Sequence, residues 1–148
     1  MNKTRKNRAL LFVVCMVLVA ATALFATGCG NNASETAEPT TVTMENGAVL
    51  GEGAKQFTFT VVDGEGNETT ATINSDADTV GEALQALNLI AGEPGDYGLY
   101  VKEVTGIRAV YEEDSTYWAF YINGEYGMTG VDKTDIETGA SYAFKVEK

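Results

Sequence analysis

One aromatic stretch, residues 117–128, gathers the side chains best suited to hold a ligand. If this stretch forms a strand, alternation places Trp118 and Phe120 on one face and Tyr117 and Tyr121 on the other. The first face is the more apolar, so we expect it to pack in the core, although such rings also contact ligands. The second face is amphipathic and serves either as a binding surface or as the outer face of a sheet.

These residues, with others nearby in the sequence, would offer aromatic and thioether surface together with an amide. The candidate ligand-binding residues are Tyr97, Tyr117, Trp118, Tyr121, Asn123, Tyr126 and Met128. Asn123 has a second explanation, because Asn123-Gly124 is a strong signal for a two-residue hairpin turn, whose residues need positive φ.

A second polar pattern, Asp63-x-Glu65-x-Asn67, imitates the start of a calcium-binding loop. The imitation is incomplete, because Glu68 stands where the loop needs glycine and Asn74 where it needs the bidentate glutamate. We therefore expect a turn here and no metal site. The acidic run 112–114 is most simply a solvated turn, although three carboxylates could attract a cation loosely.

The residue types also limit catalysis. The chain has no histidine, which removes the usual general base near neutral pH and any Ser-His or Cys-His pair. Two carboxylates brought together in space could still hydrolyse glycosides, but the acidic residues here cluster in turns. We expect a protein that is not an enzyme, has no catalytic residues and requires no cofactor.

Charge excludes one class of partner. Four of the ten basic residues precede Gly28, so the remainder of the chain carries six basic residues against 21 acidic ones, a net charge of -15. A body this acidic repels phosphate backbones, which excludes nucleic-acid binding.

The first 28 residues have the layout of a bacterial lipoprotein signal peptide. A short basic segment precedes an uncharged apolar stretch, which ends in Ala26-Thr27-Gly28-Cys29. This end resembles a lipobox, although Ala26 stands where leucine is commoner, and Cys29 would then carry the lipid. The apolar stretch is also long enough to be an uncleaved transmembrane anchor. Either alternative places the rest of the chain on the extracytoplasmic face of the bacterial cell membrane.

After the anchor, the sequence predicts a linker and one domain. Residues 29–54 have no sustained apolar period, and we expect the lipidated cysteine and a flexible tether there. Residues 55–148 suffice for one modest core. Because Cys15 leaves with the signal and Cys29 is lipidated, that core has no disulfide to support it.

The apolar pattern of residues 55–148 alternates between strand and helix signals. Alternating residues 57–61, the turn 63–67 and residues 69–73 predict a hairpin. Thr79 and Glu82 form a capping box before a helix over 80–88. A break at 91–95 then precedes strands at 99–104, 118–123 and 141–146, with shorter strands plausible at 107–111 and 126–131. This order predicts an α+β, β-grasp-like domain, with a mixed or antiparallel sheet and one short helix.

Three strings resemble the transcobalamin-like C-terminal domain family: GDYGLYVKEVTGI from residue 95, TYWAFYINGEYGMTGVD from residue 116 and IETGASYAFKV from residue 136. They follow the helix start TVGEAL, and the resemblance covers about residues 57–146. It implies a cobalamin or corrinoid ligand, without the larger helical domain that completes the site in animal carriers. Uptake through a membrane transporter is the implied role. One alternative is a module for protein-protein or cell-wall adhesion. A second alternative is a purely structural domain, in which all the aromatic side chains are buried in the core.

Overall fold

The computed structural model describes residues 41–148, which belong to one compact unit of the chain. The expected signal peptide, the lipidated Cys29 and the first part of the expected linker lie outside these residues. Within residues 41–148, no helix is long and apolar enough to cross a membrane.

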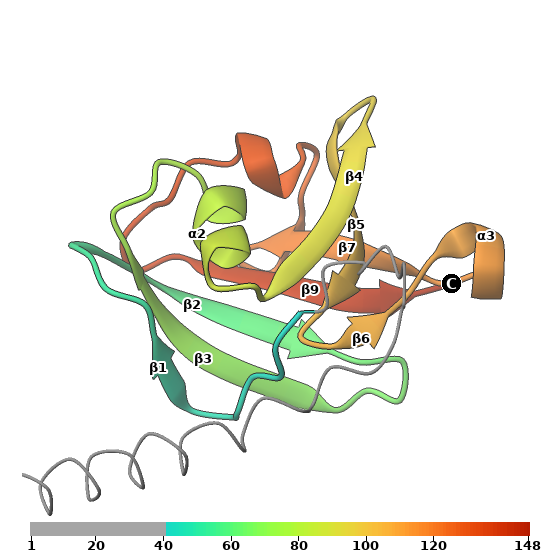
Figure 1. The fold of residues 1–148 in the computed structure, drawn as a ribbon, viewed down its shortest axis with the longest axis horizontal. Helices are drawn as coiled ribbons and strands as arrows, with labels where there is room; N and C mark the ends of the chain where they lie inside the picture. Colours follow the sequence, from blue (N-terminus) through green and yellow to red (C-terminus); the bar gives the residue numbers. More distant parts are fainter. Residues whose placement is uncertain (1–40) are drawn as a thin grey trace, which may run out of the picture. The chain divides into compact units, whose positions relative to one another are not determined.

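Two β-sheets make up most of the domain (Figure 1). The larger sheet has the order β1-β3-β2-β9-β7-β8, and the smaller has the order β4-β5-β6. The strands of the larger sheet are β1 (Ala48–Leu50), β2 (Lys55–Val62), β3 (Glu68–Ser75), β7 (Tyr117–Ile122), β8 (Glu125–Tyr126) and β9 (Ser141–Glu147). Those of the smaller sheet are β4 (Ile90–Gly95), β5 (Gly98–Val104) and β6 (Ile107–Arg108). The short helices are α2 (Val80–Ala86), α3 (Tyr111–Asp114) and the 3-10 turn η1 (Val131–Lys133).

The larger sheet is mixed, which is one of the two arrangements that the sequence predicts. β2 pairs antiparallel with β3 and parallel with β9, and β9 pairs antiparallel with β7. The last strand of the chain therefore lies in the middle of the sheet, between β2 and β7. Together with the helices, this arrangement confirms an α+β domain.

The predicted first hairpin is present, and its turn is held by one carboxylate. Asp63 accepts hydrogen bonds from the backbone N–H groups of Glu65 and Asn67 and from the Asn67 side chain, all at 2.8–2.9 Å. These bonds, that of the Asn67 side chain above all, hold the pKa of Asp63 below its ordinary value. The acidic pattern at this position therefore stabilises a turn through hydrogen bonds to Asp63.

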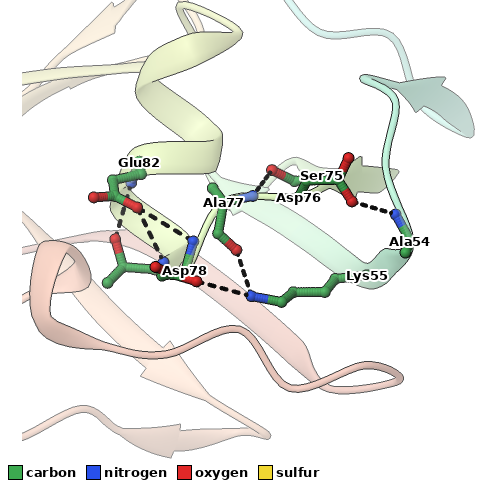
Figure 2. Close-up of polar contacts among 8 residues, drawn as sticks. Ala54, Lys55, Ser75, Asp76, Ala77, Asp78 and Glu82 are labelled. Carbon is green, nitrogen blue, oxygen red and sulfur yellow. Dashed lines mark hydrogen bonds and ion pairs between the residues drawn. The ribbon is translucent and has the colours of Figure 1, made fainter.

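Helix α2 begins at the predicted capping box (Figure 2). The Glu82 backbone N–H donates to Thr79 Oγ1 at 3.2 Å, and the Glu82 carboxylate accepts from the backbone N–H of Thr79 at 3.4 Å. Lys55, at the start of β2, donates to the carbonyl of Ala77 at 2.7 Å and so fastens the entry of the helix to the sheet. The helix ends at Ala86, two residues before the predicted end, because Asn88 adopts a positive φ of 53°.

The core lies between the helix and the larger sheet. The buried residues of α2 are Val80, Gly81, Ala83 and Leu84. Val80, Ala83 and Leu84 belong to one continuous cluster with the aromatic residues of β2 and β9. The largest fully buried side chains are Tyr142, Phe57, Phe59, Phe144, Ile73, Leu84 and Leu89. Residues 41–148 therefore contain a continuous hydrophobic core.

Residues 41–54 differ from the prediction of a flexible linker. Met44 is buried, and β1 pairs in parallel with β3, with Val49 opposite Thr72. The Thr41 backbone N–H and hydroxyl both donate to Glu103 Oε1, at 2.9 and 2.8 Å. The expectation of a tether is therefore wrong for this part, because a few side-chain contacts and one edge pairing offset the polar composition.

The predicted break at 91–95 is also wrong. Residues 90–95 form β4, which pairs antiparallel with β5 through an irregular register between Ala91 and Gly92. A Cβ on Gly92 would lie 2.1 Å from the carbonyl oxygen of Tyr100, so only glycine permits this close approach. The glycines that look like a break in the sequence are what allow this strand to pair.

Candidate functional site

A groove of about 480 Å³ opens beside the tip of the β4–β5 hairpin. Its lining comes from three segments: the hairpin tip at 95–100, strand β7, and residues 126–130, which are the end of β8 and the loop that follows it. This volume lies within the range of small-molecule sites. The lining residues are Gly95, Asp96, Tyr97, Gly98, Leu99, Tyr100, Trp118, Phe120, Tyr126, Gly127, Met128, Thr129 and Gly130.

Two aromatic residues of β7 form the buried part of this lining. Trp118 and Phe120 are only 6% and 7% exposed, so the sheet face that the sequence assigns to the core does pack there and also reaches the groove. Phe120 stacks on Tyr142 with ring centroids 6.2 Å apart and planes 7° apart. The Tyr142 hydroxyl in turn donates to the Asp135 carbonyl at 3.1 Å, so Phe120 rests on a fixed neighbour.

Three further lining residues expose large side chains to solvent. Tyr97 is 87% exposed, Met128 88% and Tyr126 54%. Leaving a methionine and a tyrosine this bare loses the favourable free energy of burying them, and apolar surface gathered at a hollow is typical of an interaction site.

The hairpin tip and the 126–130 loop are held together by close backbone contact. A Cβ on Gly130 would lie 2.9 Å from Gly98 Cα, and the Gly130 N–H donates to the Tyr97 carbonyl at 3.2 Å. Asp132 Oδ1 accepts from the Leu99 N–H at 2.7 Å and closes the same junction. The two segments therefore form one wall of the groove rather than two independent loops.

Trp118 has one polar atom that the fold leaves unused. Its indole Nε1 is buried, and no hydrogen-bond partner for it occurs among residues 41–148. A buried donor without a partner costs free energy, which makes this ring a weak point of the packing beside the groove.

The structure separates the sequence-predicted residues into two regions. Tyr97, Trp118, Tyr126 and Met128 line the groove, whereas Tyr117, Tyr121 and Asn123 do not. Tyr126 belongs to both regions, because its ring also meets the Tyr121 ring edge-on, with centroids 5.7 Å apart.

Tyr117 and Tyr121 lie on the opposite face of β7, where Glu147 engages both. Each hydroxyl donates to the Glu147 carboxylate, that of Tyr117 at 3.3 Å. Lys145 places its ammonium 4.6 Å from the centroid of the Tyr121 ring. Burial above all, then Glu147, raises the pKa of Tyr117, and the hydrogen bond to Glu147 leads the causes that raise the pKa of Tyr121. These two tyrosines already have their partners within the fold.

Asn123 serves the turn between β7 and β8. It has a φ of 50°, followed by Gly124 at 85°, as the Asn-Gly signal predicts. Its side-chain oxygen accepts from the Ser141 N–H at 2.9 Å, which fastens the turn to β9.

Sequence reasoning missed most of the hairpin tip. Asp96, Leu99 and Tyr100 line the groove, as do glycines 95, 98 and 130. The string Gly95-Asp96-Tyr97-Gly98 is a turn signal, but nothing in it reveals that Tyr97 meets a loop some 30 residues later. Within residues 41–148, no cluster of three or more His, Cys, Asp or Glu residues could hold a metal ion.

Comparisons with known proteins extend these observations. Residues 77–148 match the family described as a domain of unknown function, DUF4430. A crystal structure of a protein from Ruminococcus gnavus ATCC 29149, described with a suggested metal-binding role, is similar at 29% identity and a TM-score of 0.60. That similarity covers 64% of this chain and 98% of the other. Haptocorrin in complex with Cbi matches at 20% identity and a TM-score of 0.47, over 64% of this chain and 25% of that one. No curated protein sequence matches the chain.

Proposed function

We propose that this chain is a non-catalytic ligand-binding protein and that its groove takes a corrinoid or a similar broad, amphipathic cofactor. The observation that carries the proposal is the groove itself, with buried Trp118 and Phe120 in its lining and exposed Tyr97, Tyr126 and Met128 around them. A corrinoid has apolar faces and a rim of amides, and this lining offers rings, a thioether and backbone groups. Two of the three strings that resemble the transcobalamin-like family, those from residues 95 and 116, contain the lining residues.

The strand order supports the finer fold assignment that we propose with this function. Strands β3, β2, β9 and β7 are neighbours in that order, the central pair is parallel, and α2 lies between the first hairpin and the later strands in sequence. This is the order of a β-grasp domain.

The protein would be held at the extracytoplasmic face of the bacterial cell membrane by a lipid on Cys29. The basic segment, the apolar stretch and the small residues before Cys29 support this location. From there the domain could pass its ligand to a membrane transporter. Cys29→Ser should abolish processing and fatty-acid labelling, and a processed, membrane-retained Cys29→Ser protein would contradict the lipid anchor.

Since the chain has no histidine, it has no imidazole with which to displace a cobalt ligand. A bound corrinoid should therefore keep its own axial ligands. This gives the binding experiment a second readout, because the visible spectrum of the corrin should change little when the complex forms.

The test is equilibrium dialysis of a soluble version, residues 30–148, against cobalamin and cobinamide. Saturable retention at micromolar ligand, about -8 kcal/mol, is the expected result. Tyr97→Ala with Met128→Ala should abolish it. Tyr117→Phe with Tyr121→Phe is the matched control, because these tyrosines lie on the other face.

Absence of retention for both corrinoids would contradict the corrinoid assignment. The exposed residues of the groove would then favour the alternative role, contact with a surface protein or a cell-wall polymer. A pull-down from cell-wall extracts, compared with the Tyr97→Ala and Met128→Ala variant, would test that alternative.

A further inference from the structure

We propose that the groove selects an amphipathic cation: an apolar ligand that bears a weakly hydrated positive charge, such as a quaternary ammonium group. This inference rests on the proposed small-molecule binding at the groove and adds a preference of charge. It follows from the sign of the charged groups that line the groove.

The described lining of the groove contains one charged side chain, and its charge is negative. Among the lining residues that the structure describes, Asp96 is the one with a carboxylate, and none is a lysine or an arginine. An anionic ligand would therefore meet no positive side chain there, while a cation would find a carboxylate beside apolar rings. Charge complementarity therefore disfavours anions and favours cations.

The rings themselves favour the same sign. Tyr97, Tyr100, Trp118, Phe120 and Tyr126 contribute five aromatic side chains to one groove. The face of each ring is negative, and a cation within about 6 Å of a ring centroid is attracted by it. Apolar rings also strip water from the ligand, which a quaternary ammonium group loses more readily than a primary one.

The fold already uses this interaction at the border of the groove. Lys102 Nζ lies 5.8 Å from the centroid of the Tyr100 ring. That ammonium is paired with Glu93 at 2.8 Å, which raises the pKa of Lys102 and balances its charge. The pairing with Glu93 offsets the charge of this ammonium, which weakens its repulsion of a positive ligand.

The net negative charge of the whole domain also favours cations, through its long-range electrostatic field. Two of the 21 acidic residues, Glu35 and Glu38, precede residue 41, so residues 41–148 carry 19 acidic and six basic residues. The resulting field raises the local concentration of cations at a cleft, an effect that salt weakens. Selectivity for the cation should therefore fall as ionic strength rises, but it should not vanish, because the carboxylate and rings of the lining act at short range.

The experiment uses three ligands of one shape and the chain's single tryptophan as the reporter. The cation is benzyldimethyl(2-hydroxyethyl)ammonium, its neutral isostere is 3,3-dimethyl-4-phenylbutan-1-ol, and the anion is 3,3-dimethyl-4-phenylbutanoate. Because Trp118 lines the groove, ligand binding should change its fluorescence. With residues 30–148, we expect the cation to bind at least tenfold more tightly than the alcohol and the anion to cause no saturable change.

Two charge variants locate the origin of the preference. Asp96→Asn should reduce the preference for the cation several-fold and leave the affinity for the alcohol unchanged. Glu68→Gln removes the same charge from β3, three positions from β7 in the sheet, and should have little effect. Equal effects of the two variants would overturn the role of Asp96.

Other outcomes separate the inference from the proposed function. Equal binding of cation and alcohol would overturn the charge preference while the groove remained a ligand site. Corrinoid retention without any response to the cation would do the same. If none of the three ligands changed the Trp118 fluorescence and neither corrinoid were retained, both proposals would be overturned.

Discussion

The two tyrosine-rich regions on either side of β7 have similar composition and different structural roles. On one face, Tyr117 and Tyr121 donate their hydroxyls to Glu147, and Lys145 covers the Tyr121 ring. Beside the groove, Tyr97 and Tyr126 expose their rings, although Tyr126 also meets the Tyr121 ring. The comparison shows that a tyrosine belongs to the fold when its hydroxyl and ring have partners within the chain. It becomes a candidate for recognition when exposed ring surface borders a hollow.

The largest expected effect is that of Phe120→Ala, because this ring serves both the core and the groove. Removing a buried phenylalanine costs about 3–5 kcal/mol of unfolding free energy, and the groove should lose its ligand as well. Urea denaturation and dialysis measure the two effects. Val61→Ala is the control, since Val61 is buried in the same core but does not line the groove, and corrinoid retention should survive it.

Gly130→Ala should come next, because it opens the wall of the groove. The new Cβ would lie 2.6 Å from Asp132 Oδ1 and 2.9 Å from Gly98 Cα, so the two segments must move apart at a cost of about 1–3 kcal/mol. Gly64→Ala is the matched control, since its Cβ would meet only Val146 at 3.7 Å. Equal stability of the two variants would show that the wall is not tightly held.

Removing exposed groove residues should affect binding rather than stability. Tyr97→Ala with Met128→Ala should leave the unfolding free energy within about 0.5 kcal/mol of the parent, because both side chains are exposed. Tyr117→Ala with Tyr121→Ala should lower the urea midpoint visibly. If the first pair destabilised the domain as much as the second, the two regions would not differ as we describe.

The smallest effect concerns the titration of the tyrosines. Because the pKa of Tyr117 and Tyr121 is raised above 10, their neutral forms stabilise the fold below pH 10, and this contribution is lost as pH rises through the raised values. Glu147→Gln should lower both pKa values toward 10, which absorbance at 295 nm reports. Glu125→Gln is the control on the neighbouring strand, and an unchanged titration in Glu147→Gln would contradict the hydrogen bonds to Glu147.

Local signals predicted local structure well. The turn at Asp63, the capping box of Thr79 and Glu82 and the hairpin at Asn123-Gly124 each depend on residues within a few positions of one another. Interactions between residues a few positions apart can be predicted from the sequence, because the interacting residue types occur together in it. The division of β7 into a core face and an outer face followed from alternation alone.

The groove was only half predicted, because it depends on contacts between distant segments. Tyr97 and Met128 are separated by 31 positions, yet they line the same wall of the groove. This wall depends on the close approach of Gly98 and Gly130, which no local sequence pattern predicts. The assignment of Tyr117 and Tyr121 to ligand binding could not anticipate Glu147, which comes from another strand. The strand at 90–95 was missed because its glycines are typical of a loop.

The anchoring of residues 41–50 has a mechanical consequence. Thr41 is bound to Glu103 and to the Gly106 N–H beyond the end of β5, whereas the groove wall lies at the start of that strand, about 20 Å away along seven residues. A force pulling on the chain from its N-terminal side would load the hydrogen bonds of Thr41 and Val42 before any contact at the groove. We expect this segment to detach first under such a load, while the contacts that shape the groove stay intact.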